Sequence, residues 1–67
     1  MTRLNWLPAN PAPEVILRRD TWLASHRGWK ITYIFGLPGW WEATLDGAMI
    51  AGYDDLGDLM DRLVTTY

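Results

Sequence analysis

The chain has 67 residues, a net charge of −2 and no cysteine, and 49% of its residues are hydrophobic. A chain this short forms one domain and buries only about 60% of the surface that its unfolded form exposes. The lack of cysteine excludes disulfides and thiolate metal sites, and one histidine, His26, does not suffice for zinc. Stability must therefore come from aromatic burial, and we expect most of the five tryptophans to lie in the core.

The composition also bears on where the protein works. No stretch approaches 18 apolar residues, and prolines interrupt the apolar N-terminus, so we expect neither a membrane span nor a secretory signal. The absence of cysteine favours a reducing compartment, and we predict a cytoplasmic protein. Residues 1–30 carry a net charge of +3 and residues 31–67 a net charge of −5. This separation of charge is consistent with binding of a charged partner at either end of the chain. It is equally consistent with an ordinary solvated surface.

Residues 1–13 predict an extended, proline-rich apolar arm, followed by a single α+β domain over residues 14–67. Three prolines within six residues remove backbone donors and hold the preceding residues extended, so no regular helix is expected there. The arm either lies back on the domain or reaches for a partner. The apolar side chains that make it a candidate for partner contact are Leu4, Trp6 and Leu7.

The segment after the arm has an ambiguous beginning. Residues 15–17 fit a short strand, or the first turn of a helix that has Pro13 at its first position. A helix covering at least residues 20–27 follows, with Asp20 or Thr21 as its expected cap.

From residue 29 onward the apolar side chains recur at every second position, which is the period of a half-buried strand. A turn at residues 36–39 and the hairpin signal Asp46–Gly47 divide this region into three antiparallel strands. Matching the apolar faces fixes the register, and a first loop longer by one residue on each side fits equally well. The expected pairs are Phe35 with Gly39, Tyr33 with Trp41, Ile31 with Ala43, Leu45 with Ala48, and Ala43 with Ile50.

An amphipathic helix closes the chain. Its apolar residues recur at helical spacing, and Asp54 or Asp55 caps its start. The predicted fold is a three-stranded antiparallel β-meander with this helix on one face and a short N-terminal helix, in the order αβββα. The N-terminal helix and the arm close an end of the sheet or cover its second face. The apolar stripe of the last helix consists of Leu56, Leu59, Met60, Leu63 and Val64.

Few residues are suited to catalysis. Ser25 and His26 are adjacent on the predicted helix, so their side chains point about 100° apart and do not form a nucleophile–base pair. The acids of the last helix, Asp54, Asp58 and Asp61, lack the spacing of a cation-binding loop and are expected to form a solvated face or to dock on a basic partner. We therefore predict a non-enzymatic protein that needs no metal or cofactor.

The second face of the sheet is the candidate partner surface. Trp40 and Trp41 are consecutive, so they point to opposite sides of the sheet and only one of them enters the main core. Trp40 is either covered by a layer from Trp22 and the arm, exposed as a binding anchor, or buried by self-association. The expected partner is a protein, with a second copy of the chain as one form of it. The residues predicted for this surface are Ile34, Trp40 and Met49.

A small nucleic-acid-binding regulator is the alternative function. It would use the basic first half of the chain, since counterion release from phosphates drives such binding. Glu42 on the second sheet face and the negative net charge oppose it. The residues that would carry it are Arg18, Arg19, Arg27 and Lys30.

Residues 29–64 resemble the antitoxin half-domain of the HicB type, in which a strand leads to a Gly-aromatic-x-Ala strand, a short strand and an amphipathic helix. The matching residues are 39–43 (Gly-Trp-Trp-Glu-Ala), Gly52 and 56–63, and the Glu-Glu-Ala opening usual in that helix is replaced by Asp-Leu-Gly-Asp. The resemblance covers about half of the chain and implies a partner-binding protein that neutralises a small toxin. The tryptophan-rich composition is also similar to that of short actinobacterial and actinophage proteins, and the corresponding hypothesis is a phage-type modulator of a host protein.

Overall fold

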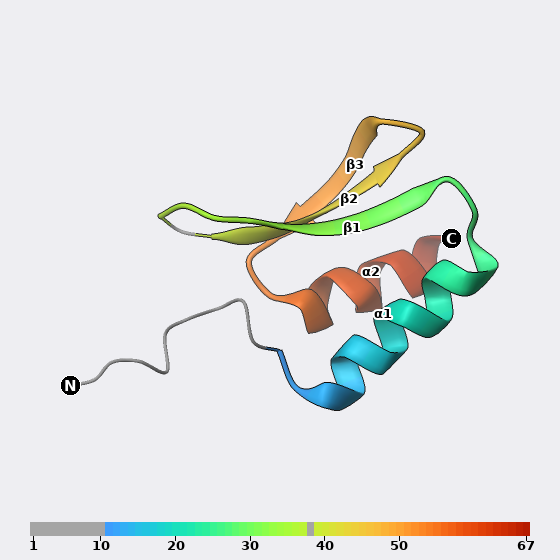
Figure 1. Cartoon of the computed structure of the whole chain (residues 1–67), viewed down its shortest axis with the longest axis horizontal. Helices are drawn as coiled ribbons and strands as arrows, with labels where there is room; N and C mark the ends of the chain where they lie inside the picture. Colours follow the sequence, from blue (N-terminus) through green and yellow to red (C-terminus); the bar gives the residue numbers. More distant parts are fainter. Residues whose placement is uncertain (1–10, 38) are drawn as a thin grey trace.

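The computed structural model describes residues 11–37 and 39–67. Five elements follow one another as α1 (Pro13–Ser25), β1 (Trp29–Ile34), β2 (Trp40–Leu45), β3 (Ala48–Tyr53) and α2 (Leu56–Thr66). The strands form one antiparallel sheet with β2 in the centre. Both helices lie on the same side of this sheet, and they contact each other as well as the strands (Figure 1). The predicted α+β meander in the order αβββα is confirmed.

Helix α1 begins earlier than the minimum span predicted for it. Pro13 occupies its first turn, and the carbonyl of Ala12 accepts hydrogen bonds from the backbone amides of Val15 and Ile16 at 3.0 and 3.2 Å. The helical interpretation of residues 15–17 is therefore correct. The expectation of a cap at Asp20 or Thr21 is wrong, because both residues lie inside the helix. The helix also ends at Ser25, two residues before the predicted end.

The first hairpin has the predicted register. Tyr33 lies opposite Trp41 and Ile31 opposite Ala43, as matching of the apolar faces requires. The predicted pairing of Phe35 with Gly39, which would have put Phe35 on the apolar face, is wrong, because β1 ends at Ile34 and Phe35 is 81% exposed. This expectation failed because strand alternation constrains a side chain only while the strand is paired.

The second hairpin contains an irregularity that the sequence did not predict. Leu45 pairs with Ala48 as expected, across a turn whose two residues both have positive φ. The predicted pairing of Ala43 with Ile50 is wrong, because Ala43 lies opposite Ala51. Ile50 is thus the extra residue of a β-bulge, and the bulge turns Ala51 and Tyr53 toward the core.

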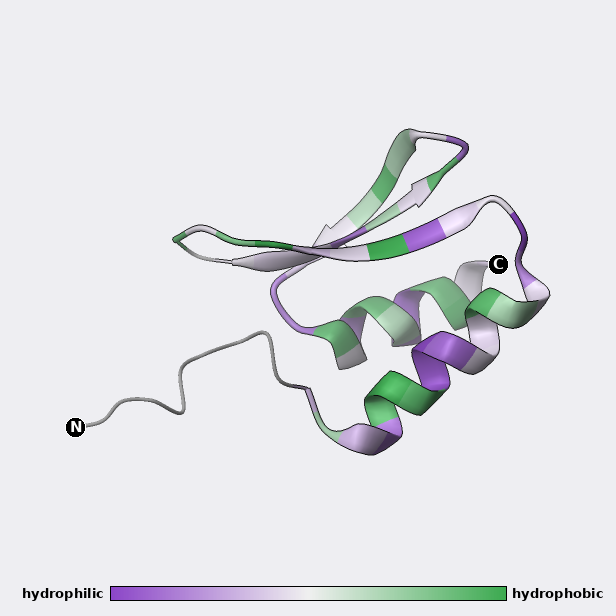
Figure 2. Ribbon diagram, in the orientation of Figure 1, coloured by the Kyte–Doolittle hydropathy of each residue, from purple (hydrophilic) through white to green (hydrophobic). Residues whose placement is uncertain are grey.

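The core lies between α2 and the sheet. Figure 2 shows hydrophobic residues recurring along α2 and along the strands, with a hydrophilic stretch in the middle of α1. Val64, the last residue of the predicted stripe, lies at its margin and remains 53% exposed. Trp22 is the buried residue that α1 adds to this core. The other buried core side chains are Trp41, Ala43, Leu56, Leu59, Met60 and Leu63.

An aromatic cluster holds the end of α1 against the sheet. Trp22 stacks on His26 with ring centroids 3.8 Å apart and meets Trp29 edge-on at 5.2 Å. Tyr67 also packs on Trp29, at 5.1 Å. Trp22 therefore lies in the helical layer, and the expectation that it covers Trp40 on the second face is wrong. The arm was also expected to help cover Trp40, but its residues 1–10 lie outside the described residues.

Replacing the capping residue of α2 should have a measurable cost. The side chain of Asp55 accepts a hydrogen bond from the backbone amide of Asp58 at 3.0 Å. Asp55→Ala is expected to lower the free energy of unfolding by about 1 kcal/mol in urea denaturation followed by circular dichroism. Asp54→Ala, which removes a neighbouring charge but not the cap, is the control and should change it by less than about 0.5 kcal/mol. Equal losses would assign the effect to charge at the helix start instead of the capping bond.

Candidate interaction surface

The sheet face opposite the helices carries the candidate site. Because α1 and α2 both occupy the other side, the described residues place no second layer over this face (Figure 1). Alternation along the strands and the bulge in β3 determine which side chains reach it. We call this surface the open face and define it by Lys30, Thr32 and Ile34 of β1, Trp40, Glu42 and Thr44 of β2, and Met49 and Gly52 of β3.

Apolar side chains lie at both ends of the open face. Ile34 and Trp40 pair directly across β1 and β2, next to the first hairpin turn. Met49 lies opposite Thr44, next to the second hairpin turn. The exposed fractions are 39% for Ile34, 37% for Trp40 and 53% for Met49. The structure thus brings the three predicted residues to one face and leaves each of them accessible.

The position of Trp40 depends on a glycine that the interaction hypothesis did not include. A Cβ atom added at Gly52 would come within 3.1–3.2 Å of three carbons of the Trp40 ring. The ring therefore lies over Gly52, and the missing side chain lets it approach the backbone of β3. A glycine inside a strand commonly marks such a close approach. Trp40 is held against the sheet instead of extending freely into solvent.

The open face also carries one positive and one negative charge, with Lys30 in the same row as Met49 and Glu42 between that row and Trp40. Lys30 pairs with Thr44 across the strands and is exposed, whereas Glu42 pairs with Thr32 and is half-buried. Among the described residues the ion pairs are Arg18 with Asp61 and Arg19 with Asp20, so neither charge of the open face is neutralised by an ion pair there. The open face is therefore neutral overall, and within the described part of the chain its two charges have no ion-pair partner.

The predicted acidic residues lie on the helical layer, apart from the open face. Asp61 accepts a hydrogen bond from the Arg18 guanidinium at 2.9 Å and so connects α2 to α1. Asp58 contributes its backbone amide to the cap, and Asp54 precedes the helix. Within residues 11–37 and 39–67, no three carboxylates or histidines are grouped to hold a metal ion.

The predicted basic residues are dispersed. Arg18 is paired with Asp61, and Arg19 bonds to Asp20 while its guanidinium lies 6.0 Å from the centroid of the Trp41 ring. Arg27 lies in the turn between α1 and β1, and Lys30 lies on the open face. The structure does not gather these four side chains into one basic surface.

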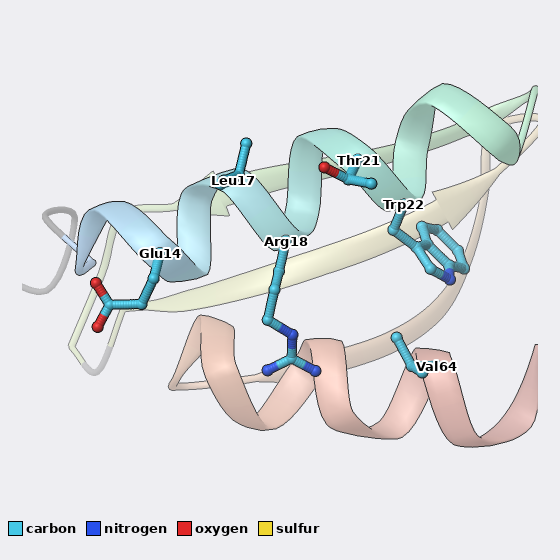
Figure 3. A pocket seen from close by; sticks show the side chains of 6 residues that line it. All are labelled: Glu14, Leu17, Arg18, Thr21, Trp22 and Val64. Atoms are coloured by element: carbon cyan, nitrogen blue, oxygen red, sulfur yellow. The ribbon is translucent and has the colours of Figure 1, made fainter.

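A groove between the two helices was not predicted from the sequence. Its volume is about 370 Å³, and Leu17 and Val64 form exposed apolar parts of its wall (Figure 3). Arg18 extends from α1 across the groove toward α2 (Figure 3). Val64, the exposed last residue of the α2 stripe, was the one signal in the sequence for this groove. The opposite wall lies on α1, and the sequence left the beginning of that helix ambiguous. The lining residues are Glu14, Leu17, Arg18, Thr21, Trp22 and Val64.

These features define the class of the protein: a small two-layer α+β domain with one sheet face that residues 11–37 and 39–67 leave uncovered. Comparison with protein families, with curated proteins and with solved structures finds no match to this chain. Among the described residues, neither helix has the length and apolar character needed to cross a membrane. The arm residues predicted to contact a partner, Leu4, Trp6 and Leu7, lie outside the described residues.

Proposed function

We propose that this chain is a non-enzymatic interaction protein of the cytoplasm, which binds a protein partner through the open face. The observation that carries the proposal is the placement of both helices on one side of the sheet, with Trp40 accessible on the other. Tryptophan is enriched among the residues that dominate binding energies, because its large apolar ring is desolvated on association. Trp40 is also held in place by Gly52, which reduces the entropy that binding must remove.

The surroundings of the single histidine support a binding role over a catalytic one. The His26 ring stacks on Trp22, and its Nδ1 atom lies 2.8 Å from the Trp22 carbonyl oxygen. This arrangement serves the packing of the helix end against the sheet. A general base instead needs a substrate proton or a nucleophile within hydrogen-bond reach.

The proposal includes two kinds of partner. The resemblance of residues 29–64 to HicB-type half-domains corresponds to a small toxin as the partner, and the tryptophan-rich composition corresponds to a host protein modulated by a phage-type protein. Nucleic acid is the less favoured ligand, since Glu42 lies on the central strand of the open face and the basic residues are dispersed. A carboxylate at the centre of a binding surface repels phosphates.

Substitution of Trp40 tests the proposal directly. The purified chain is immobilised, proteins are captured from its native cells, and the affinity of each captured partner is then measured by calorimetry. Trp40→Ala is expected to weaken that affinity at least about 30-fold, the effect of a binding hot spot. Leu17→Ala, which removes another exposed apolar side chain on the helical side, is the matched control and should leave the affinity unchanged.

Two results would contradict the proposal. One is a partner that binds the Trp40→Ala and wild-type chains equally well. The other is tight binding of generic duplex DNA whose affinity falls steeply between about 50 and 200 mM salt, which would favour the nucleic-acid alternative.

A further inference from the structure

We propose that the groove between α1 and α2 is the binding site of the chain's own N-terminal arm, with the Trp6 ring seated in the groove. This surface is separate from the open face, so the proposal is independent of the proposed function. The groove, the length of the arm and the charges of both each favour this occupant. The large apolar side chains that the arm brings are Leu4, Trp6 and Leu7.

The groove presents apolar side chains that the described residues leave in contact with solvent. Leu17 on α1 is 66% exposed, and Val64 faces it from α2 (Figure 3). Removal of such surface from water is the main favourable contribution to association. The volume of about 370 Å³ lies within the range of sites that enclose small ligands, so the groove can accept an aromatic ring.

The arm is long enough to reach every part of the groove. Its last residue, Pro13, begins α1, and the next residue, Glu14, already lines the groove. Along α1 the groove extends from Glu14 to Trp22, a length of about 12 Å at 1.5 Å per residue. Residues 6–13 span about 22 Å when extended, at about 3.1 Å per residue. A chain that reverses direction before α1 can therefore bring Trp6 onto the groove.

The charges of the arm and the groove are compatible. Arg3 is the one charged side chain of the arm. Glu14 lies at the end of the groove nearest the arm, and it forms no ion pair with another described residue. The charge of Arg18 is balanced by Asp61, whose carboxylate lies 2.9 Å away. The Arg18 guanidinium also crosses the groove, where it is suited to stack on an aromatic ring (Figure 3).

The groove is also nearer to the arm than the open face is. Both helices lie on the side of the sheet away from the open face (Figure 1), so an arm bound there would have to pass around an edge of the sheet. Because the arm is tethered to α1, its effective concentration at the groove is on the order of millimolar. A contact too weak to join two separate molecules is therefore sufficient to hold it.

Disulfide trapping in the full chain tests this proposal, since the chain has no cysteine of its own. Asn5→Cys, next to Trp6, is combined with Thr21→Cys on the groove wall. The rate of disulfide formation is measured by mass spectrometry and divided by the rate at which each thiol reacts with a small disulfide, which corrects for intrinsic reactivity. Asn5→Cys with Asp20→Cys is the matched control, because Asp20 is exposed on the same helix but does not line the groove.

The groove pair should close within one chain at least about tenfold faster than the control pair, because docking raises the local thiol concentration. Adding Trp6→Ala to the groove pair should remove this difference. Circular dichroism checks that each variant is folded.

Three results would overturn the proposal. The first is an equal rate for the two pairs, or a rate for the groove pair that Trp6→Ala does not change. The second is faster closure when Asn5→Cys is combined with Thr32→Cys, which would place the arm on the open face. The third is formation of cross-linked dimers in place of closed monomers, which would mean that the groove receives the arm of a second copy.

Discussion

Leu59→Ala is expected to lower the free energy of unfolding by about 2–5 kcal/mol, the range found when a buried leucine is truncated. Leu59 lies in the middle of α2 and has no exposed surface. Truncation leaves a cavity that the neighbouring core side chains fill only in part. At roughly 0.05–0.15 kcal/mol per residue, a chain of this length has about 3–10 kcal/mol of stability in total. The variant should therefore lose a large share of its folded population in urea denaturation followed by circular dichroism.

Val64→Ala is the matched control for this prediction. Val64 lies on the same helix, but its side chain is largely exposed on the wall of the groove. Its truncation should change the free energy of unfolding by less than about 1 kcal/mol, as is usual for surface substitutions. If the two variants were equally destabilised, α2 would not be docked through the face that contains Leu59.

Trp22→Ala is expected to cost about 3–5 kcal/mol, because it removes a buried tryptophan and the stack that holds the end of α1. Trp22 is 8% exposed and contacts the rings of both His26 and Trp29. For a domain of this size each kcal/mol corresponds to roughly 4–8 °C in Tm. A fall of more than about 10 °C should therefore appear in thermal unfolding, together with loss of the near-ultraviolet signal of the aromatic cluster.

Trp40→Ala provides the comparison within one residue type. Trp40 lies on the open face and retains contact with solvent, so its removal should cost about 1–2 kcal/mol. The variant is thus expected to fold, which its use in the binding experiment requires. A larger loss for Trp40 than for Trp22 would mean that the open face, and not the helical layer, contains the principal core.

The strands and the side of the sheet that Trp40 occupies were predictable from local pattern. Residues 29–45 alternate strictly enough to fix which side chains share a face, and Asp46–Gly47 fixes the second turn. The bulge was not predictable by the same rule. Residues 48–51 are all apolar, so no polar residue marks which of them faces solvent, and a shift by one position leaves the pattern unchanged.

The placement of α1 was also beyond the sequence pattern. Arg18, Arg19 and Asp20 interrupt its apolar residues, and Trp22 is the single residue that it buries. A helix with so little periodicity does not indicate which surface it covers. Coverage of Trp40 depended on which face of the sheet α1 occupies. Strand alternation could therefore assign the side of the sheet on which Trp40 lies, but not its exposed fraction. The groove between α1 and α2 was unpredictable for the same reason.

The bulge at Ile50 also alters the free edge of the sheet. β3 is an edge strand without a charged residue or a proline, and such edges recruit strands from other molecules into aggregates. The extra residue interrupts the even spacing of the free amide and carbonyl groups and increases the local twist. The hydrogen-bonding groups along β3 therefore do not match those of a regular strand from another molecule, which disfavours the addition of such a strand and the growth of fibres.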